Sequence, residues 1–183
     1  LEHIRPVLLA LEQVHSTGII HRDISPDNLM IRKDGSFVLI DFGAARMRNV
    51  DYTKTMTVMF KRGFSPEEQY RCKGKWGPYI DVYSISATIY FMITGTAPVD
   101  SVIRALGDDM PSLVPMKELG WSVRQRKAIM KGLAVTAKNR WQSMRELREA
   151  LFEPEVVPRK SWRRNKGFAP KWKRKIKIAA VVV

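Results

Sequence analysis

One short segment near the start of the chain constrains its fold more than any other part of the sequence. Two apolar runs, Leu29–Ile31 and Phe37–Ile40, lie on either side of the dipeptide Asp34-Gly35. This pattern is typical of a β-hairpin, because glycine adopts the positive φ that a tight turn needs. A hairpin here returns Asp41 to the neighbourhood of Asn28. The sequence therefore predicts that an amide and a carboxylate lie side by side at its open end.

The same region carries three short motifs in a fixed order. His21-Arg22-Asp23 precedes the hairpin, Asn28 begins it, and Asp41-Phe42-Gly43 follows it. Each has an ordinary structural explanation by itself, since Asn caps turns and Asp caps strand ends. In this combination they resemble the catalytic signature of the eukaryotic-type protein kinases. The chain resembles the C-terminal lobe of such a kinase and is most similar to membrane-anchored bacterial Ser/Thr kinases.

The resemblance implies a role for each motif. Phosphoryl transfer requires an acceptor hydroxyl held in line and metal ions that neutralise phosphate charge. Asp23 is then the catalytic carboxylate beside the hydroxyl. Asn28 and Asp41 are then the metal ligands, because Mg²⁺ prefers oxygen donors. The implied activity is transfer of the ATP γ-phosphate to hydroxyls of a protein substrate, with ATP and Mg²⁺ as cofactors, while His21 braces the catalytic loop.

Two later motifs extend the resemblance and predict an ion pair. Gly63–Gln69 resembles the end of the family's activation segment, and Asn139-Arg140-Trp141 resembles the late motif whose arginine pairs with its glutamate. Two registers are open, and we favour Glu68 over Glu67 as the partner. We therefore expect a buried, bidentate pair between Glu68 and Arg140, whereas Arg148 is expected to be exposed.

The segment after the third motif resembles the activation segment and contains three threonines near basic residues. Thr57 lies at the position that the family commonly phosphorylates, counted back from Glu68, and Thr55 and then Thr53 are weaker candidates. The resemblance implies that the Arg22 guanidinium pairs with the phosphate and orders the segment. The alternative is that these threonines are solvated loop residues.

The chain departs from the family pattern at two places. The family usually has a lysine two positions after the catalytic aspartate, where it steadies the transferred phosphate, and this chain has Ser25. No Gly-rich phosphate loop and no strand lysine precede His21, although the family places a small lobe there. We therefore expect that the chain is a fragment of a longer kinase and has little activity by itself.

The remaining pattern predicts a mainly α fold. Apolar periodicity indicates helices over residues 6–15, 82–93 and 123–133, and Asp81 begins the stretch that resembles the helix supporting the catalytic loop. Ser143 and Glu146 have the spacing of a capping box. We expect a protein-kinase C-lobe over residues 1–153, namely a helical bundle with a small β-hairpin at the catalytic loop, followed by a basic tail.

The end of the chain has a different composition. Ten of the 32 Lys and Arg residues lie within residues 159–177, where Asp and Glu are absent. We expect a basic juxtamembrane-like linker over residues 154–177, next to an anionic membrane surface. The apolar residues 178–183 are expected to begin a transmembrane helix, which needs about 20 residues to span. Basic residues and Trp172 beside it place the kinase on the cytoplasmic face. The alternative is a soluble cytoplasmic protein with an adhesive terminus.

Other function classes receive less support from the sequence. A pseudokinase or scaffold that binds partners without catalysis is favoured by Ser25 and opposed by Asp23, Asn28 and Asp41. The basic tail alone does not indicate nucleic-acid binding, since such a tail binds phosphate without specificity. Cys72 is the single cysteine, which excludes a disulfide framework within the chain and a multi-cysteine metal cluster.

Overall fold

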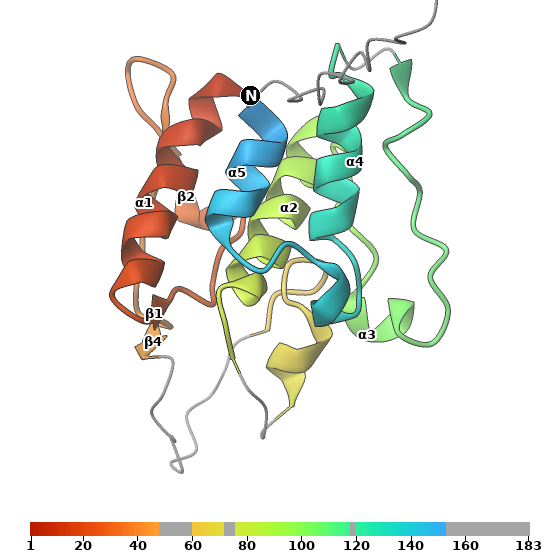
Figure 1. Ribbon diagram of the computed structural model, residues 1–183, viewed down its shortest axis with the longest axis horizontal. Coiled ribbons are helices and arrows are strands. Elements are labelled where there is room, and N and C mark those ends of the chain that lie inside the picture. The colour runs from red at the N-terminus through yellow and green to blue at the C-terminus, as the bar shows by residue number, and fades with distance from the viewer. Residues whose placement is uncertain (48–59, 72–75, 118–119, 153–183) are drawn as a thin grey trace, which may run out of the picture. The chain divides into compact units, whose positions relative to one another are not determined.

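Helix α2, spanning Tyr79–Thr94, is the centre of the computed structural model. Every residue from Ile80 to Tyr90 is buried, as expected for a helix that is apolar on all sides. Helices α4 (Val123–Gly132) and α5 (Met144–Phe152) pack directly against it, and α1 (Arg5–Ser16) packs on α5. Figure 1 shows α5 between α1 on one side and α2 with α4 on the other. The predicted helical bundle is confirmed.

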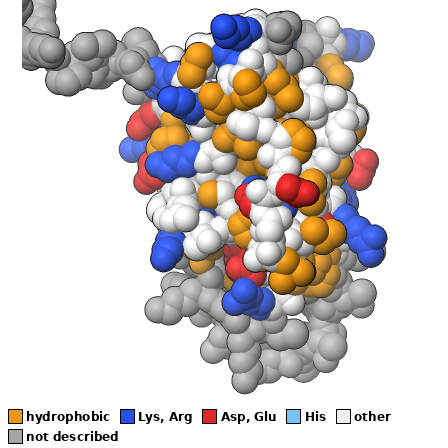
Figure 2. All heavy atoms as spheres, turned by 90° about the vertical axis from the view of Figure 1, so that its right-hand side faces the viewer, with side chains coloured by type: hydrophobic (Ala, Val, Ile, Leu, Met, Phe, Trp, Pro, Cys, Tyr) orange, Lys and Arg blue, Asp and Glu red, His pale blue; other side chains and the backbone are white. Residues whose placement is uncertain are grey.

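The structure describes residues 1–47, 60–71, 76–117 and 120–152. Thr53, Thr55, Thr57, Cys72 and the tail from residue 154 onward lie outside the described residues. No helix within the described ranges is long and apolar enough to cross a membrane. On the face that Figure 2 shows, the described Lys and Arg side chains are scattered among apolar and neutral ones.

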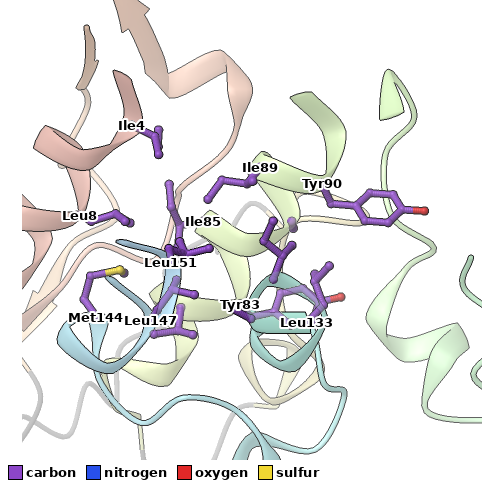
Figure 3. Close-up of a cluster of buried hydrophobic side chains, with 14 of the residues drawn as sticks. Ile4, Leu8, Tyr83, Ile85, Ile89, Tyr90, Leu133, Met144, Leu147 and Leu151 are labelled. Carbon is purple, nitrogen blue, oxygen red and sulfur yellow. The ribbon is translucent and has the colours of Figure 1, made fainter. Parts of the chain in front are cut away.

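The core lies where α1, α2 and α5 meet (Figure 3). Leu8 of α1, Ile85 and Ile89 of α2, and Leu147 and Leu151 of α5 are each at most 2% exposed. Burying one such side chain contributes about 1.5–3 kcal/mol to folding. These contacts hold α2 in a fixed position, and α2 carries the residue that anchors the catalytic loop.

One glycine sets how closely α4 approaches α2. A Cβ atom at Gly132 would lie only 2.0 Å from Ser86 Oγ, closer than any side chain tolerates. The absence of a side chain at this position therefore allows the two helix backbones to pack in close contact. This requirement is set by the partner helix and has no signature in the local sequence.

The predicted hairpin is present and pairs as expected. Strands β2 (Leu29–Ile31) and β3 (Phe37–Leu39) are antiparallel, with Leu29 opposite Leu39. Gly35 has a φ of +82°, and Asp34 Oδ1 accepts a hydrogen bond from Ser36 N–H at 2.9 Å. A second antiparallel pair joins β1 (Ile19–Ile20) to β4 (Arg46–Met47). β1 and β4 lie just outside the three motifs, and the β2–β3 hairpin separates Asn28 from Asp41.

Short helices connect these elements. They are η1 (Glu2–Ile4), η2 (Pro26–Asn28), η3 (Glu67–Tyr70), α3 (Ser101–Arg104) and η5 (Ala137–Asn139). The predicted capping box before α5 is incomplete. Ser143 Oγ accepts from Glu146 N–H at 3.2 Å, but the Glu146 carboxylate accepts from Gln142 N–H. A complete capping box instead begins α4, between Ser122 and Gln125, where the sequence analysis did not expect one.

Arg140 pairs with Glu68 and not with Glu67. Its Nη1 and Nη2 donate to the two Glu68 carboxylate oxygens at 2.5 and 3.0 Å. The Arg140 side chain is fully buried, and it also donates to the carbonyl oxygens of Ala134 and Val135, at 2.6 Å each. Glu67 instead pairs with the exposed Arg71. The structure thus resolves the two registers that the sequence left open in favour of Glu68.

The expectation that Arg148 is exposed is wrong. Its side chain is 14% exposed and hydrogen-bonds to Glu12 of α1. The cause is tertiary, because the packing of α1 on α5 brings the two side chains together. Arg148 is therefore unsuitable as an exposed control for Arg140, whereas Arg71, with a side chain 67% exposed, is well matched.

We predict that Arg140→Ala destabilises the 183-residue chain far more than Arg71→Ala. Removing one partner of a buried ion pair typically costs about 3–5 kcal/mol, because the other charge remains buried without a partner. An exposed pair contributes only about 0–1 kcal/mol. Thermal unfolding followed by circular dichroism measures the difference, and equal melting temperatures for the two variants would contradict the prediction.

Candidate active site

The catalytic loop is anchored by Asp81 in the first turn of α2. The Asp81 side chain is completely buried, and its Oδ2 and Oδ1 accept hydrogen bonds from His21 N–H at 2.8 Å and Arg22 N–H at 2.9 Å. His15 Nε2 lies 2.7 Å from Oδ2. Arg22 has a φ of +69°, which a residue other than glycine rarely adopts. Two consecutive N–H bonds to one carboxylate hold the loop in this conformation.

His21 lies within the protein and supports the loop from inside. Its Nδ1 accepts a hydrogen bond from Asp23 N–H at 3.3 Å, and its ring meets Phe42 edge-on, with centroids 4.6 Å apart. Burial lowers the pKa of His21 below its ordinary value, although the nearby carboxylates of Asp81, Asp23 and Asp41 act to raise it. The imidazole is therefore neutral at neutral pH and has the contacts of a bracing residue.

Asp23 and Asn28 are joined directly. Asn28 Nδ2 donates to the Asp23 carbonyl oxygen at 2.6 Å and to Asp23 Oδ2 at 2.9 Å. These two bonds fix the orientation of the Asp23 carboxylate, which is 22% exposed and so accessible to a substrate. They also occupy the amide nitrogen of Asn28, which leaves its side-chain oxygen to serve as a ligand.

Asp41 follows the hairpin immediately. Ile40 N–H donates to the Asn28 carbonyl oxygen at 2.9 Å, so the hairpin brings Asp41 next to Asn28 as the sequence predicts. Asp41 is exposed, and its Oδ1 accepts from Gly43 N–H at 2.9 Å. Among the described residues, no group of three or more His, Cys, Asp or Glu side chains is placed to hold a metal ion. The exposed Asp41 carboxylate and the side-chain oxygen of the largely buried Asn28 are oxygen donors that fit Mg²⁺, which keeps waters and takes phosphate oxygens as its other ligands.

Lys61 enters this site from the far end of the activation segment, at a position that no sequence motif predicted. Its Nζ donates to Ser25 Oγ at 2.8 Å and lies 3.5 Å from Asp23 Oδ1 and 3.6 Å from Asp27 Oδ2. No local pattern marks Lys61. The only signal in the sequence was the unusual Ser25, which does not reveal what lies opposite.

Arg22 presents a buried cation on the side of the activation segment. Its guanidinium stacks on Trp76, 4.0 Å from the ring centroid, and its carbonyl accepts from Gln69 Nε2 at 2.7 Å. Burial and the nearby charge of Arg46 lower the pKa of Arg22, while Asp81 raises it. Among the described residues, no group accepts a hydrogen bond from Arg22 Nε or Nη2.

The structure thus brings Arg22, Asp23, Asn28 and Asp41 together in one site. Glu68 and Arg140 have a structural role, because their ion pair joins the activation segment to the helical bundle. A carboxylate oriented by an amide, beside a cation and two metal-binding oxygens, has the parts that phosphoryl transfer needs. The sequence comparisons agree with this chemistry. A family model described as "Protein kinase domain" matches residues 2–155.

Individual relatives show the same likeness over part of their length. The chain is 32% identical over 149 residues to a probable serine/threonine-protein kinase of Clostridium perfringens, covering 77% of this chain and 21% of that protein. It is 36% identical over 97 residues to sperm motility kinase 2B of Mus musculus, covering 53% of this chain and 20% of that protein. Since relatives come from bacteria and animals alike, a bacterial origin stays a prediction.

A solved structure confirms the kinase fold. The structure titled "PpkA-294 apo form" matches with a TM-score of 0.69 and 32% identity, covering 82% of this chain and 54% of its own. The chain thus spans about half of this solved structure and about a fifth of the two curated relatives.

Proposed function

The chain belongs to the protein kinase family, and we propose that it supplies the catalytic residues of a serine/threonine kinase that uses ATP and Mg²⁺. The observation that carries this proposal is the pair of hydrogen bonds by which Asn28 orients the Asp23 carboxylate beside Asp41. The substrate is then a protein hydroxyl. Serine/threonine preference rests on the likeness to kinases of that type.

In the proposed reaction Asp23 orients the acceptor hydroxyl and takes its proton. A bond forms between the hydroxyl oxygen and the γ-phosphorus, while the bond from that phosphorus to the bridging oxygen breaks and its electron pair leaves with ADP. Asn28 holds the Asp23 carboxylate in position. Mg²⁺ bound to the oxygens of Asn28 and Asp41 would supply positive charge to the phosphates.

The segments that cover the nucleotide in kinases, the Gly-rich loop and the strand lysine, have no counterpart in this sequence. The chain spans about half of the solved structure that it matches, so we assign the activity to the complete kinase, meaning this chain joined to the N-terminal half of a kinase domain. The alternative is a scaffold without catalysis. Ser25 favours that alternative, whereas the mutual arrangement of Asp23, Asn28 and Asp41 favours catalysis.

The scattered basic side chains in Figure 2 lend no support to nucleic-acid binding by that face.

In the complete kinase we predict that Asp23→Asn lowers kcat by about 10²–10⁴-fold, the usual contribution of a positioned acid–base group. The KM for ATP should change little. Asp41→Asn should instead raise the Mg²⁺ concentration needed for activity as well as lowering kcat. Transfer of radiolabelled phosphate from ATP to a generic protein substrate measures both effects.

The matched control is Asp34→Asn, because Asp34 is an exposed carboxylate at the hairpin turn, away from the proposed chemistry. It should retain normal turnover. Unchanged turnover in Asp23→Asn would remove the catalytic assignment and favour the scaffold alternative.

We propose that phosphorylation of the activation segment at Thr57, with Thr55 as the second candidate, regulates this site through Arg22. These threonines lie outside the described residues, so the support comes from Arg22. Arg22 is 5% exposed, its guanidinium lies close to the charge of Arg46, and its Nε and Nη2 donate to no described residue. Such a buried cation is stabilised by an anion, and a phosphate accepts from guanidinium donors in bidentate geometry.

Mass spectrometry of the active complete kinase should therefore find phosphate on Thr57. Thr57→Ala and Arg22→Gln should each lower activity, and the double variant should lose no more than the larger single loss, because both changes remove one interaction. Thr53→Ala should have a smaller effect. Phosphate found only outside residues 44–62, or fully additive losses, would contradict the proposal.

We propose that the basic linker, residues 154–177, contacts an anionic membrane surface and keeps the kinase at the cytoplasmic face. The support is compositional, since residues 159–177 contain ten basic residues and no acidic ones and precede an apolar run. These residues lie outside the described part of the chain.

The complete gene product should sediment with membranes after cell lysis. If the linker alone holds it there, high salt should release it, and if residues 178–183 begin a membrane span, only detergent should. Recovery of the protein in the soluble fraction at low salt would favour the soluble alternative.

A further inference from the structure

Lys61 places a positive charge next to the Asp23 carboxylate. Its Nζ is 2.8 Å from the hydroxyl of Ser25, which is completely buried, and 3.5 Å from Asp23 Oδ1. Asp27 Oδ2 lies 3.6 Å away but belongs to a side chain that is 83% exposed. Of the three ammonium donors, one is engaged at hydrogen-bond distance by a described residue. Lys61 is 25% exposed, so its ammonium group is accessible to a ligand beside Asp23.

The backbone that carries Lys61 is fixed by a tight turn. The Lys61 carbonyl accepts from Phe64 N–H and Ser65 N–H, both at 2.9 Å, and its own N–H donates to Ser65 Oγ at 3.1 Å. Gly63 allows this turn with a φ of +81°, and a Cβ there would lie 2.5 Å from the Pro98 carbonyl oxygen. Ser101 Oγ of α3 also donates to the Ser65 carbonyl at 2.8 Å. The ammonium group is therefore presented from a rigid base.

We propose that Lys61 is a catalytic residue that binds the γ-phosphoryl group during transfer, with Ser25 as the side chain that positions it. This proposal rests on the proposed function. The carboxylate that takes the hydroxyl proton must lie within a few ångströms of the phosphorus that is attacked. A cation held 3.5 Å from that carboxylate reaches the same phosphoryl oxygens. An ammonium there stabilises the negative charge of the transition state.

The contacts of Lys61 favour this role over a purely structural one. A structural lysine would be expected to satisfy its donors on carboxylates at close range, but here both carboxylates lie at 3.5 Å or beyond and the short bond goes to a neutral hydroxyl. Donors are thus left for phosphate oxygens. Because Lys61 arises from the end of the activation segment, the cation reaches Asp23 only when that end of the segment is folded in place. The arrangement thereby links the order of the segment to catalysis.

The test uses the complete kinase and the variant Lys61→Met. We expect kcat to fall about 100-fold, the size of effect seen when one group that stabilises a transition state is removed. The KM for ATP and the melting temperature should stay close to wild type. Lys33→Met is the matched control, because Lys33 is an exposed lysine in the hairpin turn. If Lys61→Met lowers the melting temperature, Lys61→Gln, which keeps a polar end near Ser25, replaces it.

A double variant that moves the positive charge from residue 61 to residue 25 distinguishes a catalytic role of Lys61 from a structural one. Adding Ser25→Lys to Lys61→Met returns an ammonium group to the same place from the catalytic loop, and we expect it to restore kcat at least tenfold. Ser25→Lys alone should not raise kcat, since two ammonium groups then compete for one place. Wild-type kcat in Lys61→Met, or a loss that Ser25→Lys does not restore, overturns the role of Lys61 while the kinase assignment stands. Absence of phosphotransfer in the wild-type complete kinase overturns both.

Discussion

The buried carboxylate of Asp81 is the interaction on which the site depends. Its two oxygens hold the consecutive N–H groups of His21 and Arg22, and His15 from α1 contacts the same group. A buried carboxylate is costly unless it is fully hydrogen-bonded, so the loop and the helix stabilise one another. Because Asp81 is in the helix that the core encloses, the rigidity of the core is transmitted to the residues that precede Asp23.

From that anchor the site is assembled out of three separate parts of the chain. The catalytic loop contributes Asp23 and Asn28, the hairpin returns Asp41, and the end of the activation segment contributes Lys61. The same segment is fastened to the bundle through Glu68 and Arg140. A change in the path of the activation segment therefore moves the Lys61 ammonium group relative to the Asp23 carboxylate.

Much of this arrangement follows from local sequence patterns. The periodicity of apolar residues predicted α1, α2 and α4, the spacing of Ser143 and Glu146 marked the start of α5, and Asp34-Gly35 between two apolar runs predicted the hairpin. The order of the three motifs then indicated Asp23, Asn28 and Asp41 as site residues, and the resemblance named Glu68 as the favoured partner of Arg140. Two expectations were wrong, the exposure of Arg148 and the capping box of α5, and in each a contact with another residue outside the local pattern was the cause. Arg148 is covered by α1, and the α5 cap takes Gln142 as a donor instead of closing on itself.

The sequence by itself determined the family, the main helices, the hairpin and which acidic and amide groups are candidates for the site, because these depend on short-range periodicity and on motifs with fixed spacing. Only the tertiary structure decided which charges meet. Lys61 and Ser25 are 36 residues apart in the chain, yet their side chains are in hydrogen-bond contact. A hydrogen bond depends on the distance between donor and acceptor in space, which must be about 3 Å, and not on their separation along the chain. For that reason the replacement of a lysine by Ser25 looks like a loss in the sequence, whereas in the folded protein a cation lies beside Asp23.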